Sequence, residues 1–139
     1  AGSRFILGQT AQLREGRDLT FVACGETVAP AVAAADLLVA GGISCRVLSM
    51  HTLKPLDAAA VLAAAVETRA IITVEEHSAH GGLGEACAAV LLQAGACVPF
   101  RIVGFPDEYM VTGSQADIFQ HYGISPAGLA ATARALLSR

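Results

Sequence analysis

Apolar and polar residues follow two different periods along the chain, which predicts strands and helices in turn. Residues 19–24 form a nearly continuous apolar run that ends at a glycine, as is typical of a strand buried on both faces. Residues 26–40 have apolar residues at helical spacing, and Pro30 suits the first turn of the predicted helix. Gly41 and Gly42 mark its end. The stripe expected to be buried is Val28, Val32, Ala35 and Val39.

The same strand-then-helix unit is repeated twice. Residues 45–50 predict a second strand, and Asp57 is the predicted N-cap of the helix that follows it. Residues 70–75 predict a third strand, which a polar loop with several glycines separates from a third helix. The stripes expected to be buried are Val61, Leu62, Ala65 and Val66 in the second helix, and Leu83, Cys87, Val90, Leu91 and Ala94 in the third.

The last third of the chain predicts a fourth strand, over residues 100–104, and two helices. A loop over residues 105–113 leads to a short helix that Ser114 caps and Gly123 ends. Ser125 is the predicted N-cap of the final helix, with a proline at the first helical position. The stripe of that helix is Leu129, Ala133, Leu136 and Leu137.

Strands and helices that alternate at these lengths predict an α/β fold with a mostly parallel sheet and helices on both faces. Residues 10–13 are expected to add a short antiparallel strand at one edge. Ala1-Gly2-Ser3 resembles the remnant of a cleaved tag. We therefore divide the chain into residues 1–17, the tag remnant and lead-in strand, and residues 18–139, the domain proper.

The composition favours tight packing and excludes several classes of protein. Of the 139 residues, 54% are hydrophobic and 15% are charged, which excludes intrinsic disorder. So little charge is typical either of a domain that buries one face against another domain or subunit, or of a surface that is simply rich in alanine. Basic residues are scattered within a net charge of -3, so we expect no nucleic-acid partner.

We expect a cytosolic protein with no membrane partner. No apolar run approaches the roughly 20 residues that a membrane-spanning helix needs. The N-terminus also lacks the charged and then apolar layout of a signal peptide. The four cysteines form no C-x-x-C pair, so they are expected to be reduced and buried. They are Cys24, Cys45, Cys87 and Cys97.

Most of the unusual polar residues follow the predicted strands directly. They lie in four segments, one after each strand. Because the carboxyl ends of parallel strands meet at one edge of an open sheet, where ligands and helix N-termini gather, these segments are expected to share a rim. The four segments are residues 25–27, 51–55, 76–82 and 106–109.

The loop over residues 75–84 is the most distinctive of these segments. Its glycines match only the first part of the G-x-G-x-x-G fingerprint, and Glu85 would repel a phosphate at the start of the next helix. A tight turn for close packing is therefore favoured over a nucleotide site.

Carboxylates and imidazoles in the same loop raise the question of a metal site. His77 and His80 are three residues apart in a glycine loop, whereas the H-E-x-x-H motif places its histidines four apart on a helix. A hydrogen-bonded interface cluster of Glu75, Glu76, His77 and His80 is the favoured interpretation.

His51, at the end of the second strand, is the best single candidate for contacting a small ligand, because imidazole can donate a proton or bind an anion near neutral pH. The simpler alternative is a loop histidine bonded to nearby backbone. The chain contains no G-x-S-x-G motif, and no other arrangement for nucleophilic catalysis is evident.

Two motifs make the sequence familiar. M-H-T-L-K-P-L-D at residues 50–57 and E-E-H-S-A-H-G-G-L-G-E-A at residues 75–86, together with residues 18–28 and 103–109, resemble the C-terminal domain of transketolases over nearly the whole chain after Asp18. The form of the first motif is most similar to transketolases split into two subunits. The resemblance implies a three-layer α/β/α domain with a five-stranded sheet, one edge strand of which is antiparallel.

The family also implies a division of labour between domains. Transketolases transfer a two-carbon ketol unit between sugar phosphates, and thiamine diphosphate supplies the electron sink. The resemblance implies that this cofactor and its magnesium are held by other domains, with none bound by this chain alone. It further implies a buttress that packs on the other domains or on the N-terminal subunit of a homodimeric parent, and that is inactive by itself.

The family therefore gives the rim residues a place at an interface or at the lip of the channel to the cofactor, and no catalytic role. Where the loop departs from the family pattern, at Phe105 and residues 109–112, the choice of substrate and partner is left open. The residues carried over are His51, Glu75, Glu76, His77, His80, Gly81 and Gly82.

Two alternatives stay open at this point. The chain could be the C-terminal domain of a pyruvate-dehydrogenase-type beta subunit or of a deoxyxylulose-phosphate synthase, which carry related domains. A second alternative is a free-standing regulatory module that binds a small anionic metabolite at the carboxyl edge of the sheet.

Overall fold

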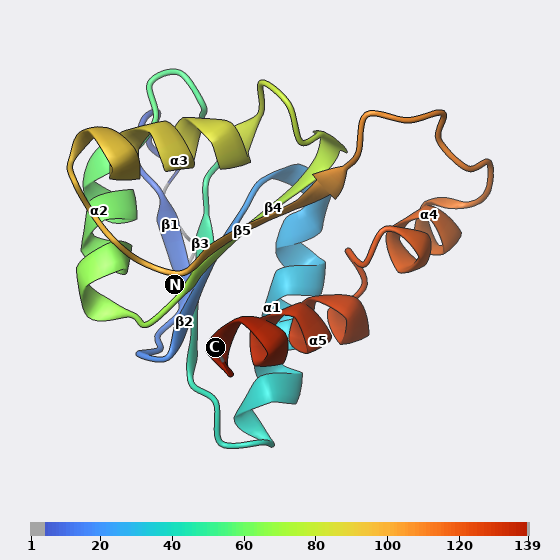
Figure 1. Cartoon of the computed structure of the whole chain (residues 1–139), viewed down its shortest axis with the longest axis horizontal. Helices are drawn as coiled ribbons and strands as arrows, with labels where there is room; N and C mark the ends of the chain where they lie inside the picture. Colours follow the sequence, from blue (N-terminus) through green and yellow to red (C-terminus); the bar gives the residue numbers. More distant parts are fainter. Residues whose placement is uncertain (1–4, 139) are drawn as a thin grey trace.

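The computed structural model describes residues 5–138, which form a five-stranded sheet between two layers of helices (Figure 1). The strand order is β1-β3-β2-β4-β5; β1 runs antiparallel to β3 and every other pair is parallel. This confirms the expected three-layer fold and the antiparallel edge strand. The expected tag remnant lies outside the described residues. The strands are β1 (Ala11–Arg14), β2 (Leu19–Ala23), β3 (Cys45–Ser49), β4 (Ile71–Ser78) and β5 (Phe100–Phe105).

The helices divide between the two faces of the sheet. Helices α2 (Ala58–Glu67) and α3 (Leu83–Gln93) cover one face, and α1 (Val28–Val39) and α5 (Pro126–Leu137) cover the other (Figure 1). The short helix α4 (Gln115–His121) lies beyond the carboxyl end of β5, after a loop that arches away from the sheet. A single 3-10 turn, η1 (Gly25–Thr27), precedes α1. None of the described helices is long and apolar enough to span a membrane.

The predicted N-caps are confirmed. The Asp57 side chain accepts a hydrogen bond from Ala60 N at 3.0 Å and begins α2. Ser114 forms a capping box with Asp117 at the start of α4. At the start of α5, the Ser125 side chain accepts from the amide of Gly128 at 3.3 Å. Each cap satisfies an amide that the first turn of a helix leaves without a partner.

The core has two parts because successive side chains of a strand point to opposite faces. Leu19 and Phe21 of β2 point toward α1 and α5, whereas Val22 points toward α2 and α3. All five residues of β2 are buried, as expected of the central strand.

Three predicted helical stripes are partly wrong. Val39 of α1 and Val66 of α2 were expected inside, but they are 62% and 86% exposed. Ala94, expected on the buried stripe of the third helix, is exposed at the C-cap of α3. In α1 and α2, alanines share the buried positions with Leu38 and Val61, because alanines let a helix axis approach the sheet more closely than valines do. The buried residues are Ala31, Ala34, Ala35 and Leu38 in α1, and Val61 and Ala64 in α2.

The cysteine prediction holds for most of the four thiols. All are free; Cys45 and Cys87 are buried and Cys24 is half-buried, but Cys97 is exposed, which contradicts the expectation for that residue. Burial raises the pKa of Cys24 to about 11, and raises the pKa values of Cys45 and Cys87 to about 12. These three thiols are therefore protonated at neutral pH and behave as small apolar side chains.

Candidate functional site at the carboxyl rim of the sheet

Four segments meet where the parallel strands end, and we call them together the rim: residues 24–27, 50–57, 75–85 and 106–114. Each lies at the carboxyl end of a strand and reaches η1, α2, α3 or α4. Strand β4 continues to Ser78, so Glu75, Glu76 and His77 lie in the strand and not in a loop, which corrects the predicted boundary. The ladder with β5 extends this far because Ser78 pairs with Phe105 after an irregularity in register.

Glu75 is the most deeply placed polar residue of the rim. Its side chain is 0% exposed. Oε2 accepts a hydrogen bond from Leu83 N at 2.7 Å, and Oε1 accepts one from Gly84 N at 2.9 Å. Helix α3 has glycine at its N-cap position and no side-chain cap of its own. Glu75 therefore supplies from the sheet the acceptors that the first turn of α3 needs.

Glycines make room for this carboxyl group. A Cβ added at Gly82 would lie 1.9 Å from Glu75 Oε2, and one at Gly104 would lie 2.9 Å from Glu75 Cγ. A Cβ at Gly84 would meet the side chain of Ile102 at 2.5 Å. Gly81 has a φ of 75°, the left-handed conformation that glycine adopts readily. The structure thus shows the predicted tight turn with close packing.

Glu76 joins three parts of the rim. Its Oε1 accepts from Glu26 N at 3.1 Å, and its Oε2 accepts from Gln115 Nε2 at 3.4 Å. The side chain therefore connects the end of β4 to the turn after β2 and to α4. Gln115 and Glu26 were not singled out from the sequence, because nothing in a local pattern shows which segments a carboxylate will bridge.

The histidines of the β4–α3 segment bind locally. His77 Nδ1 lies 3.1 Å from Glu75 Oε2, and the side chain is 47% exposed. His80 Nδ1 lies 3.3 Å from Glu85 Oε1, while Glu85 Oε2 accepts from Gly81 N at 2.7 Å. The bond from the Gly81 amide, then that from His80, lowers the pKa of Glu85. Glu85, expected only to repel phosphate, therefore holds the turn together.

His51 is separate from this cluster. It follows β3, with β2 between it and β4 in the sheet. Its Nε2 lies 3.0 Å from Ile6 O, and its ring stacks on Phe5 with centroids 4.1 Å apart. The simpler alternative, a loop histidine bonded to backbone, is the one observed. The partner is the lead-in segment, residues 5–10, which also binds the rim where Thr10 N donates to Asp57 Oδ2 at 2.7 Å.

The rim is mainly acidic. Lys54 is its only lysine or arginine, whereas it contains several carboxylates. Among residues 5–138 no group of three histidine, cysteine, aspartate or glutamate side chains is placed to hold a metal ion. The α3 amides that an anion would use are already bonded to Glu75. The residues present therefore do not suit a diphosphate with its magnesium. The acidic residues are Glu26, Asp57, Glu75, Glu76, Glu85, Asp107 and Glu108.

Comparison with known proteins identifies the family of the chain. The family described as "Transketolase, C-terminal domain" matches residues 8–129. The chain belongs to this family. One of the subunits of an apulose-4-phosphate transketolase of Phocaeicola vulgatus is 47% identical over 129 residues, which cover 93% of this chain and 41% of that protein.

Two further comparisons show how much of its relatives this chain covers. A 1-deoxy-D-xylulose-5-phosphate synthase of Heliobacterium modesticaldum is 41% identical over 130 residues, covering 94% of this chain and 20% of that protein. A solved structure described as "Split gene transketolase, inactive beta4 tetramer" superimposes with a TM-score of 0.86 at 38% identity, covering 97% of this chain and 43% of that one. This transketolase C-terminal domain thus spans less than half the length of these relatives.

Proposed function

We propose that this transketolase C-terminal domain is a structural and assembly domain of a thiamine-diphosphate-dependent transferase that moves a ketol unit between sugar phosphates. The observation that carries the proposal is the buried carboxyl group of Glu75, both oxygens of which are bonded to α3 amides. The most deeply buried carboxyl group of the motif therefore organises the fold and is not free to activate a substrate. The active centre would be built by other parts of the parent enzyme.

The division between residues 1–17 and 18–139 stays a prediction. We propose that His51, His77 and His80, with Glu75, Glu76, Gly81 and Gly82, shape a surface that faces the neighbouring domain or subunit, at an interface or beside the channel to the cofactor. His77 and His80 present 47% and 70% of their side chains to solvent, so they are accessible to such a neighbour. The lead-in segment supports the same orientation, because it lies on the rim and exposes Phe5 and Leu7, 66% and 72% exposed.

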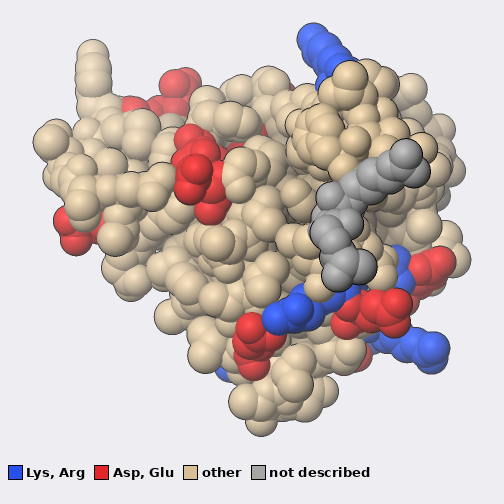
Figure 2. Space-filling view, turned by 180° about the vertical axis from the view of Figure 1, so that it is seen from behind, with Lys and Arg blue, Asp and Glu red and all other residues tan. Residues whose placement is uncertain are grey.

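The surface composition agrees with a domain that is partly covered in its parent. Figure 2 shows that much of the face seen from behind carries neither acidic nor basic side chains. Leu92 and Tyr109, 78% and 103% exposed, are among the large apolar side chains on the surface. We propose that the other domains or the N-terminal subunit of a dimeric parent cover part of this area. Four free cysteines support a cytosolic location.

The proposal is tested with the purified chain and with its parent. We expect the chain alone to show no calorimetric heat with thiamine diphosphate and magnesium, and no ketol transfer between sugar phosphates. Activity is expected only when the rest of the parent is added, and the coding sequence upstream of Arg4 or in the adjacent frame is the place to look for it. Micromolar cofactor binding, or turnover by the chain alone, would exclude an assembly role.

The second candidate is the C-terminal domain of a deoxyxylulose-phosphate synthase. The likeness to the Heliobacterium modesticaldum synthase favours it. The two candidates are distinguished by assaying the complete parent for formation of 1-deoxy-D-xylulose 5-phosphate and for ketol transfer. We expect the parent to catalyse ketol transfer, because the split transketolase relative shares more of its length with this chain than the synthase does.

A further inference from the structure

The two edges of the sheet are protected to different degrees. Strand β1, at one edge, has four residues and a register irregularity between Gln12 and Arg14. Strand β5, at the other edge, has six residues and, within residues 5–138, pairs only with β4. The β4–β5 ladder is irregular too, but its extra residues lie in β4, between Val74 and Ser78, and not in the edge strand. A short edge strand with an irregularity of its own discourages further pairing, whereas a longer edge strand without one offers a row of hydrogen-bonding groups to another strand. The β5 edge is thus the more available of the two.

The open groups of β5 can be assigned from its register with β4. Ile71 pairs with Phe100, and Ile71 N donates to Pro99 O at 2.9 Å; after the register irregularity, Ala79 N donates to Phe105 O at 2.9 Å. The backbone N–H and C=O groups of successive residues point to opposite sides of a strand. Those of the odd-numbered residues of β5 therefore point toward β4. The N–H and C=O groups of Phe100, Ile102 and Gly104 therefore face away from β4. Within residues 5–138 these groups have no hydrogen-bond partner.

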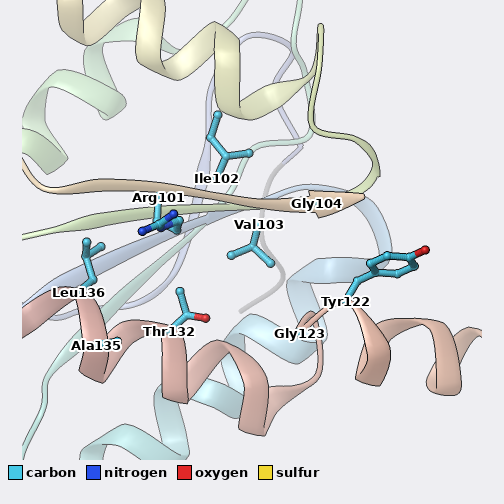
Figure 3. Close-up of a pocket in the computed structure, with 9 residues that line it drawn as sticks. All are labelled: Arg101, Ile102, Val103, Gly104, Tyr122, Gly123, Thr132, Ala135 and Leu136. Carbon is cyan, nitrogen blue, oxygen red and sulfur yellow. The ribbon is translucent and has the colours of Figure 1, made fainter. Parts of the chain in front are cut away.

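A hollow of about 350 Å³ lies beside this edge, on the side of α5. Figure 3 shows Val103 pointing toward α5 and Ile102 pointing to the opposite side of the strand. Side chains from a strand added at the β5 edge would therefore alternate between this hollow and the α3 side. Arg101, Val103, Tyr122 and Ala135 are among the residues that line the hollow.

The unpaired backbone groups of β5 are arranged so that the β5 strand of a second copy can bond all of them. In an antiparallel pair of β5 strands with a two-fold axis at Ile102, Ile102 faces Ile102 of the second copy, and Phe100 faces Gly104 on both sides. Every open N–H and C=O group of the strand then has a partner. A register displaced toward the end of β5 would bring Pro106 into the ladder, and Pro106 has no N–H to donate.

We propose that the β5 edge is an interface between two copies of this chain, joined through antiparallel β5 strands into one continuous sheet. The contact is isologous, as closed dimers require. Arg101 then faces Val103 of the second copy, and its aliphatic stem covers part of the hollow. The inference goes beyond the proposed assembly role and does not depend on it, because it uses only the backbone of β5 and the hollow beside it.

Sedimentation equilibrium with a matched pair of variants tests the surface. Ala135 lines the hollow on α5, and Ala89 lies on α3, across the sheet; both are exposed helical alanines. We expect the wild-type chain to dimerise as its concentration rises over a roughly hundredfold range. We expect Ala135→Arg to weaken the association constant by roughly tenfold or more, and Ala89→Arg to leave it unchanged. A chain that stays monomeric, or a dimer weakened only by Ala89→Arg, would overturn the proposal.

Amide hydrogen exchange by NMR tests the strand pairing itself and needs no variant. The amides of Ile102 and Gly104 are expected to exchange rapidly in dilute protein and to gain protection as the dimer forms. Those of Arg101 and Val103, which face β4, stay protected at every concentration. Dimerisation without this alternating change would mean that another surface associates. If only an added extended peptide, and not protein concentration, protected the two amides, the occupant would be a foreign strand and the proposal would be wrong.

Discussion

The rim segment that follows β4 and the one that follows β5 are similarly polar in sequence, but they differ in structure. The first contains Glu75, which is completely buried, and Gly82, which is buried against it. The second contains Tyr109, 103% exposed, and Met110, 45% exposed. Few hydrogen bonds hold this second segment in place. In one of them, Val111 N donates to the Tyr122 hydroxyl at 3.3 Å.

The difference shows that a polar loop at the end of a strand is not by itself a binding site. Whether such a loop can bind a partner depends on whether its hydrogen-bond donors and acceptors are free. Around β4 they are bonded to the next helix and to each other, so that segment acts as part of the core. After β5, Ser114 caps α4, but the side chains of Asp107, Glu108 and Tyr109 have no hydrogen-bond partner within residues 5–138, so that part of the segment is the one available to a neighbour. The predictions below test this contrast.

The largest effect is expected at Gly82. Replacing it with alanine places a Cβ 1.9 Å from Glu75 Oε2, and the buried carboxyl group must then leave the α3 amides or α3 must move. We expect Gly82→Ala to lower the free energy of unfolding by about 3 to 5 kcal/mol, measured by urea denaturation. The matched control is Gly81→Ala, where a Cβ meets nothing within 4 Å, so the cost is only that of a positive φ, about 1 kcal/mol. Equal losses at both positions would contradict the packing argument.

The next effect concerns Glu75 itself. Glu75→Gln keeps the shape but turns an amide NH2 toward one of the two α3 amides, which leaves that donor buried without an acceptor. We expect a loss of about 2 to 3 kcal/mol in the free energy of unfolding. Glu76→Gln, one residue further along and half-buried, should cost less than about 1 kcal/mol. A larger loss at Glu76 would mean that bridging the rim matters more than capping α3.

Much of the fold was readable from the sequence because its signals are local. A strand such as β2 is recognised from its apolar run without tertiary information. Helix starts are predicted from residues whose side chains cap the first turn, here Asp57, Ser114 and Ser125. The apolar stripes failed at Val39 and Val66 for a physical reason. In helices so rich in alanine nearly every position is apolar, so periodicity does not show which side meets the sheet.

The candidate site was less readable, because its geometry depends on the sheet. The rim was expected from the topology, and a helix that begins after Gly82 without a side-chain cap signals that an acceptor must come from elsewhere. That Glu75 provides it, eight and nine residues away, follows from where β4 ends relative to α3. The separation of His51 from the β4 cluster likewise reflects strand order, which a single sequence does not state.

A smaller effect on stability is expected in the segment after β5. Tyr109→Ala removes a side chain that is fully exposed, so the free energy of unfolding should change by no more than about 0.5 kcal/mol. In the parent enzyme the same variant should weaken association of the domain or subunit that covers this segment, because exposed tyrosines often dominate interfaces. Sedimentation of the parent checks the association. Destabilisation of the isolated chain would show that this segment is packed after all.

The smallest effect is a local pH dependence at the opposite end of the rim. Burial opposes ionisation of Asp57, but hydrogen bonds from Thr10 N, Ala60 N and the Thr10 hydroxyl outweigh it and lower the pKa below its ordinary value of 3.8. A lowered pKa means that these bonds stabilise the fold above that ordinary value and weaken as the pH falls through the lower one. Exchange of the Thr10 amide, followed by NMR, should therefore speed up at acid pH while the amides of β2 stay protected. Asp57→Asn should remove the pH dependence and keep the α2 cap, since asparagine also caps helices. If the Thr10 amide of this variant still responded to acid, the lead-in segment would be held to the rim by a group other than Asp57.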